Sequence, residues 1–307
     1  METAPQLVQR LLVMVSAGLS PLVLVAAFIG VLILITKFRR QRPSWQPGRP
    51  PALRSPEAVR IARRMRRNKQ TSLLLSAADK AGFSKLGGNP DYPLDAAWPI
   101  GPEGALRFWA QLDLGELRVG GGPEWLPPEG RLYVFFDERM GATDQVQVIF
   151  APSTAALAAR PAQDASAWPF HERRIAFVRQ ESLPSLDWLA EDIAGIELED
   201  DELDTLVDMA APAGPSPQHR IGGYPEEIQD EQMALSCERA LGSTDDAEND
   251  ATVLRRAVRT WKLLVQIDSD AELGTSFGDG GRLYVFVRGD DARRGEFSET
   301  VTLYQTS

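Results

Sequence analysis

The sequence predicts an α+β fold: an internally duplicated, mostly antiparallel sheet core with flanking helices, preceded by one N-terminal transmembrane helix. Two observations predict it. The hexapeptide GRLYVF occurs at residues 130–135 and again at residues 281–286. Residues 11–36 contain no charged side chain, and as a helix they would span about 39 Å, against a hydrocarbon core of about 30 Å.

We expect residues 11–36 to cross a membrane, with residues 1–10 as a short extracytoplasmic N-terminus. A cleaved signal peptide fits badly, because basic residues 37–40 follow the apolar run where small residues should mark a cleavage site. Twelve Lys or Arg side chains lie between Lys37 and Lys69, but only Arg10 precedes the run. The positive-inside rule therefore predicts a single-pass protein of the cell (inner) membrane with a cytoplasmic C-terminal domain.

Residues 37–70 are predicted to be a basic, Pro-rich stalk and juxtamembrane helix. Five prolines between residues 42 and 56 favour an extended spacer. Ser55-Pro56-Glu57 then has the capping hydroxyl, proline and acid of a helix start. Six basic residues in that helix either attract an anionic lipid surface or only set the membrane orientation: Arg60, Arg63, Arg64, Arg66, Arg67 and Lys69.

The two parts of the chain have opposite charge. Residues 1–69 carry a net charge of +11, and residues 70–307 carry −21. A domain this acidic repels nucleic-acid phosphates, so no nucleic acid is expected as a partner. The expected partners are membrane lipid, bound through the span and the stalk, and an unknown protein or small ligand. The single cysteine, Cys237, excludes an intrachain disulfide.

Residues 71–307 contain four elements that recur in one order, which predicts repeats at about residues 84–150 and 219–307. These are a GGxP turn followed by an acid, a QxD sequence at a strand end, GRLYVF, and a final strand. Alternation in the first QxD strand predicts that Leu106, Phe108, Ala110 and Leu112 share one face. The same alternation predicts that GRLYVF is a core strand in each repeat, with one face formed by Leu132, Val134 and Phe136 in the first and by Leu283, Val285 and Val287 in the second. Between the repeats lies an acidic insert, residues 171–213. Its helices either present solvated acidic faces or attract the basic juxtamembrane helix.

Several of these stretches together resemble the YwqG-like family of domains of unknown function. They are SKLGGNPDYP, FWAQLDL, HRIGGYPEEIQ and GDGGRLYVFVR, and the resemblance extends over about Leu74 to Gln305. It implies an α+β fold with a duplicated sheet core. It implies no established activity and no agreed catalytic residues.

Asp113 and Asp268 are the candidate catalytic pair, because repeats that face one another would bring the two carboxylates together. Close carboxylates separate in pKa and can act as acid and base. The alternative is that each one binds backbone amides of its own turn. The other repeated motif residues are candidates for ligand binding: Gly87, Gly88, Gln111, Arg131, Gly222, Gly223, Gln266 and Arg282. The glycines would otherwise serve turns, and the arginines would pair with the aspartates.

No metal site and no cofactor are expected. His171 and His219 have no cysteine partners, and the phosphate-binding pattern GxxxxGK[ST] does not occur. Residues 268–279 resemble a calcium loop, but Leu273 stands where that loop needs glycine. Two functions remain. The first is a membrane-anchored cytoplasmic binding or regulatory module of unknown ligand, without catalysis, and the alternative is a carboxylate-based hydrolase with a cleft between the repeats.

Overall fold

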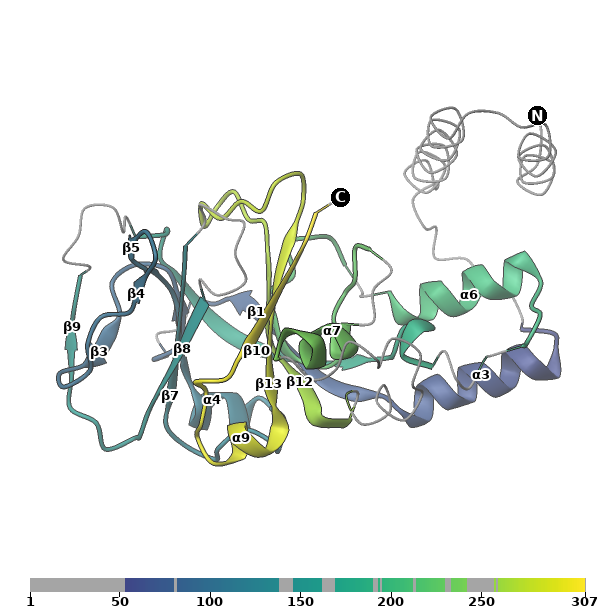
Figure 1. Ribbon diagram of the computed structural model, residues 1–307, viewed down its shortest axis with the longest axis horizontal. Coiled ribbons are helices and arrows are strands. Elements are labelled where there is room, and N and C mark those ends of the chain that lie inside the picture. Colours follow the sequence, from purple (N-terminus) through teal and green to yellow (C-terminus); the bar gives the residue numbers. More distant parts are fainter. Residues whose placement is uncertain are drawn as a thin grey trace. The chain divides into compact units, whose positions relative to one another are not determined.

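The computed structural model describes residues 53–79, 82–137, 146–161, 169–189, 193, 195–211, 214–229, 233–241, 257 and 259–306. The predicted membrane span and the Pro-rich spacer lie outside these residues. No helix in the described ranges is both long and apolar enough to cross a membrane. Residues Pro51–Ser307 form one compact unit, drawn in colour in Figure 1.

The unit has an α+β fold built on a ten-stranded antiparallel sheet, in the order β14-β13-β12-β11-β1-β10-β2-β6-β7-β8. Its strands are β1 Gln70–Ala77, β2 Lys85–Leu86, β6 Arg107–Asp113, β7 Arg131–Phe136, β8 Val146–Ala151, β10 Arg173–Ser182, β11 Arg220–Gly222, β12 Trp261–Asp268, β13 Arg282–Arg288 and β14 Val301–Gln305. Smaller pairs join β3 Asp91–Pro93 to β9 Leu157–Ala159, and β4 Ile100–Gly101 to β5 Gly104–Ala105. The described helices are α3 Pro56–Arg67, α4 Leu114–Val119, the 3₁₀ turn η1 Asp187–Leu189, α6 Asp200–Ala210, α7 Met233–Ala240 and α9 Gly289–Arg293.

The strand order is symmetrical about the central pair, β1 and β10. Strands β2, β6, β7 and β8 follow on the β10 side, and β11, β12, β13 and β14 follow on the β1 side. The two GRLYVF segments supply β7 and β13, which are the third strands outward on each side. A duplicated domain would produce this symmetry.

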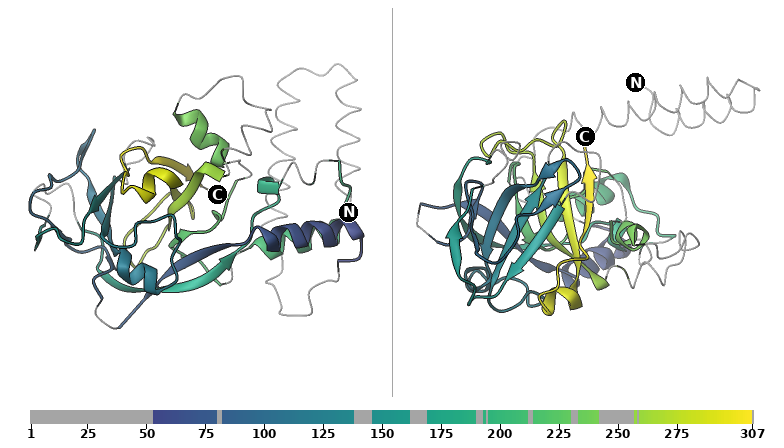
Figure 2. Two further views of the ribbon diagram at one scale, coloured as in Figure 1. Left: turned by 90° about the horizontal axis from the view of Figure 1, so that it is seen from below. Right: turned by 60° about the vertical axis from the view of Figure 1, so that its left-hand side comes forward.

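The sheet curls so that one edge strand approaches the segment that leads into the other. Phe150 on edge strand β8 and Phe297, just before edge strand β14, have ring centroids 6.1 Å apart. In a flat sheet, nine strand spacings of about 4.8 Å would separate these edges. Strands of the two halves consequently pack near one another in both figures (Figures 1 and 2). One main core lies between the halves, and it contains the inward side chains predicted from GRLYVF: Leu132, Val134, Phe136, Leu283, Val285 and Val287.

The expectation of a single apolar face on β6 is wrong. A β-bulge lies between Phe108 and Ala110. Leu106 and Phe108 therefore pack in an outer cluster, whereas Ala110 and Leu112 face the main core. An extra residue reverses the alternation of a strand, and strand β12 has a register shift at the corresponding place.

Helix α3 packs its apolar face against the acidic helix α6, beside which it lies in Figure 1. Ser55 caps α3 as predicted, accepting a hydrogen bond from the Ala58 amide at 3.0 Å. Glu202 of α6 accepts hydrogen bonds from the backbone amides of Arg54 and Ser55, both at 2.7 Å. Ile61 on α3 and the acidic helix share one apolar cluster. The basic helix thus contacts the acidic insert mainly through apolar packing and through the hydrogen bonds that Glu202 accepts at the N-terminus of α3.

Candidate functional site

In the first half of the sheet, a buried glutamine forms hydrogen bonds to the backbone on both sides of the GGxP turn. Gln111 on β6 accepts a hydrogen bond from the backbone amide of Asp91 at 2.8 Å and donates one to the Phe83 carbonyl at 2.7 Å. Tyr133 on β7 donates to the Asp91 carbonyl at 2.7 Å, and burial raises the pKa of its hydroxyl, which keeps it a donor. The Gln111 side chain is fully buried, and its hydrogen bonds position the GGxP turn.

The second half repeats this arrangement. Gln266 on β12 accepts a hydrogen bond from the Glu226 amide at 2.9 Å, and Tyr284 on β13 donates to the Glu226 carbonyl at 2.6 Å. The Gln266 amide group also donates to Asp268 at 2.9 Å. Both candidate glutamines therefore bind the protein's own turns.

The candidate catalytic carboxylates, Asp113 and Asp268, lie apart and have separate partners. Asp113 caps α4 by accepting a hydrogen bond from the Glu116 amide at 3.0 Å. Asp268 is buried and accepts one from the Gln218 amide at 2.8 Å. Each aspartate lies two residues after its glutamine, so the two side chains lie on the same face of the strand. This is the outer face of that half of the sheet. Because the sheet curls around the main core, that core lies between the two carboxylates.

The two candidate arginines pair with these aspartates across neighbouring strands. Arg131 is in register with Asp113, and their Nε and Oδ2 atoms are 3.8 Å apart. Arg282 is in register with Asp268, and the corresponding Nε–Oδ1 distance is 3.1 Å. Arg282 also bonds Glu226 at 2.8 Å. Both arginines thus serve structural ion pairs.

Arg220, which the sequence analysis did not select, completes a buried cluster of charges with Arg282, Glu226 and Asp268. Its Nη2 atom is 3.2 Å from a carboxylate oxygen of Glu226. Burial lowers the pKa of Arg220 and raises that of Glu226, although the two groups attract one another. The sequence signal was present, because Arg220 precedes its GGxP turn as Lys85 precedes the first.

The GGxP glycines permit close approach of the backbone. Gly87 has φ +61°, and a Cβ atom there would lie 2.1 Å from the His171 carbonyl oxygen. Gly223 has φ +77°, and its Cβ would lie 2.8 Å from the Cβ atoms of Ser72 and Ser182. Side chains are excluded at both positions, which supports a role in turn packing for these candidates and for their neighbours, Gly88 and Gly222.

A cavity of about 310 Å³ opens on the outer face of the central strands, beside Arg220. Its polar side comes from strands β1, β10 and β11, and its apolar side comes from the end of α6 and the segment after β10. The lining residues are Ser72, Gln180, Glu181, Ser182, Leu183, Met209, Ala210, Ala211 and Arg220. This volume lies at the lower end of the range for small-molecule sites.

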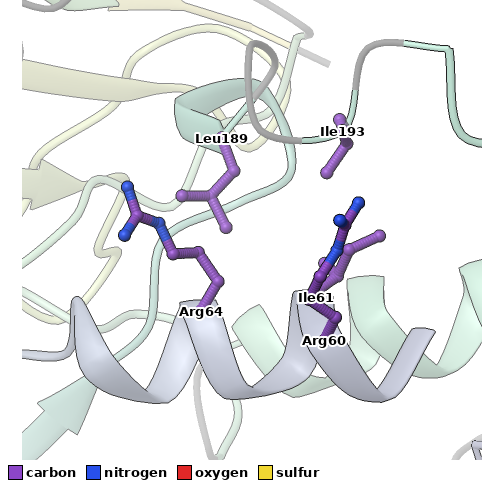
Figure 3. Close-up of a pocket in the computed structure, with 5 residues that line it drawn as sticks. All are labelled: Arg60, Ile61, Arg64, Leu189 and Ile193. Carbon is purple, nitrogen blue, oxygen red and sulfur yellow. The ribbon is translucent and has the colours of Figure 1, made fainter. Parts of the chain in front are cut away.

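The exposed surface of α3, with the recess between it and η1, is a second candidate surface. Its basic residues and Lys69, just beyond its end, are exposed. A pocket of about 210 Å³ lies between α3 and the η1 segment. Figure 3 shows Arg60 and Arg64 rising from the helix toward Leu189 and Ile193, with Ile61 at the apolar base. This surface combines positive charge with a small apolar recess.

Asp270, in the loop that resembles a calcium site, and His219 bond to partners inside the protein. Asp270 bonds Arg173 at 2.7 Å and His219 at 3.1 Å. Burial alone would raise the pKa of Asp270, but hydrogen bonds from these two partners hold it well below its usual value. Across the described ranges, no group of three or more His, Cys, Asp or Glu side chains is arranged to hold a metal ion.

Comparison with known families finds one relationship. A family model described as "Domain of unknown function (DUF1963)" matches residues 84–306. The match includes both predicted repeats and the acidic insert, whereas α3 and β1 precede it. No curated protein matches the chain.

Proposed function

The chain belongs to the DUF1963 family of domains of unknown function, and from this premise we propose that it is a membrane-anchored binding or regulatory module with its folded unit in the cytoplasm. The finer resemblance to the YwqG-like family, over Leu74 to Gln305, is part of the same proposal. So is the membrane span at residues 11–36, which rests on its uncharged, apolar sequence.

The orientation of α3 carries the proposal. Its buried residues, such as Ile61 and Met65, pack toward α6 and η1, whereas its basic side chains are exposed. In sequence, this helix follows closely on the predicted span that ends at Thr36. Near an anionic leaflet, each basic residue contributes about 1 kcal/mol of attraction. The exposed basic side therefore suits a module held against the cytoplasmic membrane surface.

The hydrolase alternative has less support. An acid–base pair needs two carboxylates within reach of one substrate; in glycosidases they are about 5 to 9.5 Å apart. Asp113 is used as a helix cap, and Asp268 is buried among Gln218, Gln266 and Arg282. Each carboxylate thus has structural partners within its own half, and this weakens the support for a shared acid–base pair.

Membrane fractionation of the full chain tests the proposal. We expect the protein to remain with the membrane after alkaline carbonate washing. We also expect added protease to cleave the folded unit in inverted vesicles but not in intact spheroplasts. Combining Leu24→Arg with Ile29→Arg should move the protein to the soluble fraction, because a charge at the centre of a span costs about 2.5 to 3.5 kcal/mol.

A matched control places the same two charges on the folded unit. Val119 and Val178 are 90% and 45% exposed, so Val119→Arg with Val178→Arg should leave the protein in the membrane fraction. Extraction of the wild-type chain by alkaline carbonate would contradict the membrane anchor. Cleavage of the folded unit in intact spheroplasts contradicts the proposed orientation.

A further inference from the structure

In the first half of the sheet, a glutamate neutralises a buried lysine. Lys85 pairs in register with Arg174 of β10, and Glu172 lies two residues earlier, just before the strand begins. The Glu172 carboxylate accepts a hydrogen bond from Lys85 Nζ at 2.8 Å, and the Asn89 carbonyl accepts another at 2.7 Å. Gly88 packs against this glutamate, since a Cβ atom there would lie 3.0 Å from the glutamate Cβ. The lysine charge is therefore satisfied within the chain.

In the second half, a serine occupies the position equivalent to that of Glu172. Arg220 pairs in register with Leu74, and Ser72 lies two residues before Leu74 on β1. The glycine contact recurs, because a Cβ atom on Gly223 would lie 2.8 Å from the Ser72 Cβ. Serine is shorter than glutamate and has no carboxylate. The second half therefore has no carboxylate at this position, and Arg220 pairs instead with Glu226 of its own turn.

Two buried donors beside this place have no hydrogen-bond partner among the described residues: the Ser72 hydroxyl and Arg220 Nε. These side chains are 1% and 4% exposed. Both line the cavity of about 310 Å³. A buried donor left unsatisfied destabilises the protein, so a ligand group that accepts both hydrogen bonds would be favoured here.

We propose that this cavity binds a small carboxylate-bearing molecule. Its carboxylate would take the position that the Glu172 carboxylate has in the first half, and would accept hydrogen bonds from Ser72 and Arg220. The apolar wall formed by Leu183 and Met209 suits a short aliphatic group on the ligand. This inference rests on the proposed function as a binding module and names its ligand class.

The acidic groups near the cavity already have cationic partners. Glu181 lines the cavity and pairs with Lys69. Glu226 pairs with Arg282 at 2.8 Å as well as with Arg220. Burial lowers the pKa of Arg220 although Glu226 lies beside it, and its Nε atom still has no acceptor among the described residues.

Three probes that differ only in their polar group test the ligand class: hexanoate, hexanamide and hexylammonium. Each is titrated into the purified full chain in detergent, in a buffer without carboxylates, with calorimetry and thermal unfolding as readouts. We expect hexanoate to bind about tenfold more tightly than hexanamide, because hydrogen bonds to a charged acceptor are stronger than hydrogen bonds to a neutral one. Hexylammonium should not bind. Equal binding of hexanoate and hexanamide, or no binding of hexanoate, overturns the proposal.

Substitutions at Ser72 locate the binding. Ser72→Glu restores the residue found in the first half, so it should abolish hexanoate binding without lowering Tm. The control, Ser76→Glu, adds the same charge on β1 outside the cavity lining and should bind hexanoate as the wild type does. Ser72→Ala removes one donor with little change in volume and should weaken binding about fivefold. Wild-type affinity in both Ser72 variants overturns the site.

The two proposals can fail separately. A chain that stays in the membrane fraction but binds no hexanoate contradicts only the ligand class. A chain that binds hexanoate but is soluble contradicts only the anchor.

Discussion

Gln111 and Gln266 make the same hydrogen bond in the two halves of the sheet. Each side-chain oxygen accepts a hydrogen bond from the backbone amide of the acidic residue that follows its GGxP sequence. The distance is 2.8 Å to the Asp91 amide and 2.9 Å to the Glu226 amide. Both side chains are fully buried. The repeated glutamine therefore joins a turn to the sheet in the same way in each half.

Replacing either glutamine with leucine should destabilise the folded unit. Gln111→Leu and Gln266→Leu each leave a buried backbone amide without its acceptor, which costs about 1–3 kcal/mol of unfolding free energy. Urea denaturation measures this loss. The control is Gln147→Leu, because Gln147 makes its hydrogen bond at the surface and should lose less than about 0.5 kcal/mol. Equal losses in all three variants would show that the buried contacts are not special.

The ionised Asp270 carboxylate should make the free energy of unfolding decrease as the pH becomes acidic. Its folded-state pKa is depressed, so its contribution is complete above the unfolded value of about 4 and is lost as pH falls through the folded value. Asp270→Asn should lower the unfolding free energy at neutral pH by about 3 kcal/mol, since it breaks buried pairs with Arg173 and His219. The difference from wild type should shrink below about pH 4.

Urea denaturation at a series of pH values checks this prediction. Asp95→Asn is a suitable control, because Asp95 is exposed and its variant should follow the wild-type curve. If the curves of wild type and Asp270→Asn stayed parallel down to pH 2, the ionised carboxylate would not be the stabilising form.

Gly87→Ala should be far more damaging than Gly274→Ala. Both glycines have positive φ, +61° and +82°, and a left-handed alanine costs about 1–2 kcal/mol. Around Gly274 there is nothing within 4 Å of an added Cβ, whereas at Gly87 the His171 carbonyl oxygen would lie at 2.1 Å. We expect a loss of about 1 kcal/mol for Gly274→Ala, and a largely unfolded or insoluble protein for Gly87→Ala. Comparable Tm values for the two variants would contradict the packing role.

Part of the fold follows from local patterns. Ser55-Pro56-Glu57 predicted the start of α3, and Ser55 caps it. Alternation in GRLYVF correctly predicted which side of β7 and β13 faces the core. The same reasoning failed for β6, because the bulge between Phe108 and Ala110 depends on how this strand meets its partner.

The candidate site was predictable within each half but not between the halves. Repetition correctly grouped glutamine, aspartate and arginine, and Asp268 with Arg282 is one resulting pair. Repetition does not say how two equivalent groups are placed relative to one another. It also could not select Ser72, which precedes the first repeat in the chain and matches Glu172 only through the register of β1 with β11 and of β10 with β2.

The sequence by itself determined the antiparallel sheet, the buried faces of its GRLYVF strands and the acidic character of residues 70–307, because alternation, turn chemistry and charge are local properties. Tertiary structure alone decided that Asp113 and Asp268 lie on outward faces, and that Ser72 and Arg220 meet at one cavity. The physical reason is the curl of the sheet. It buries one face along all ten strands and brings side chains from strands distant in sequence to the same place.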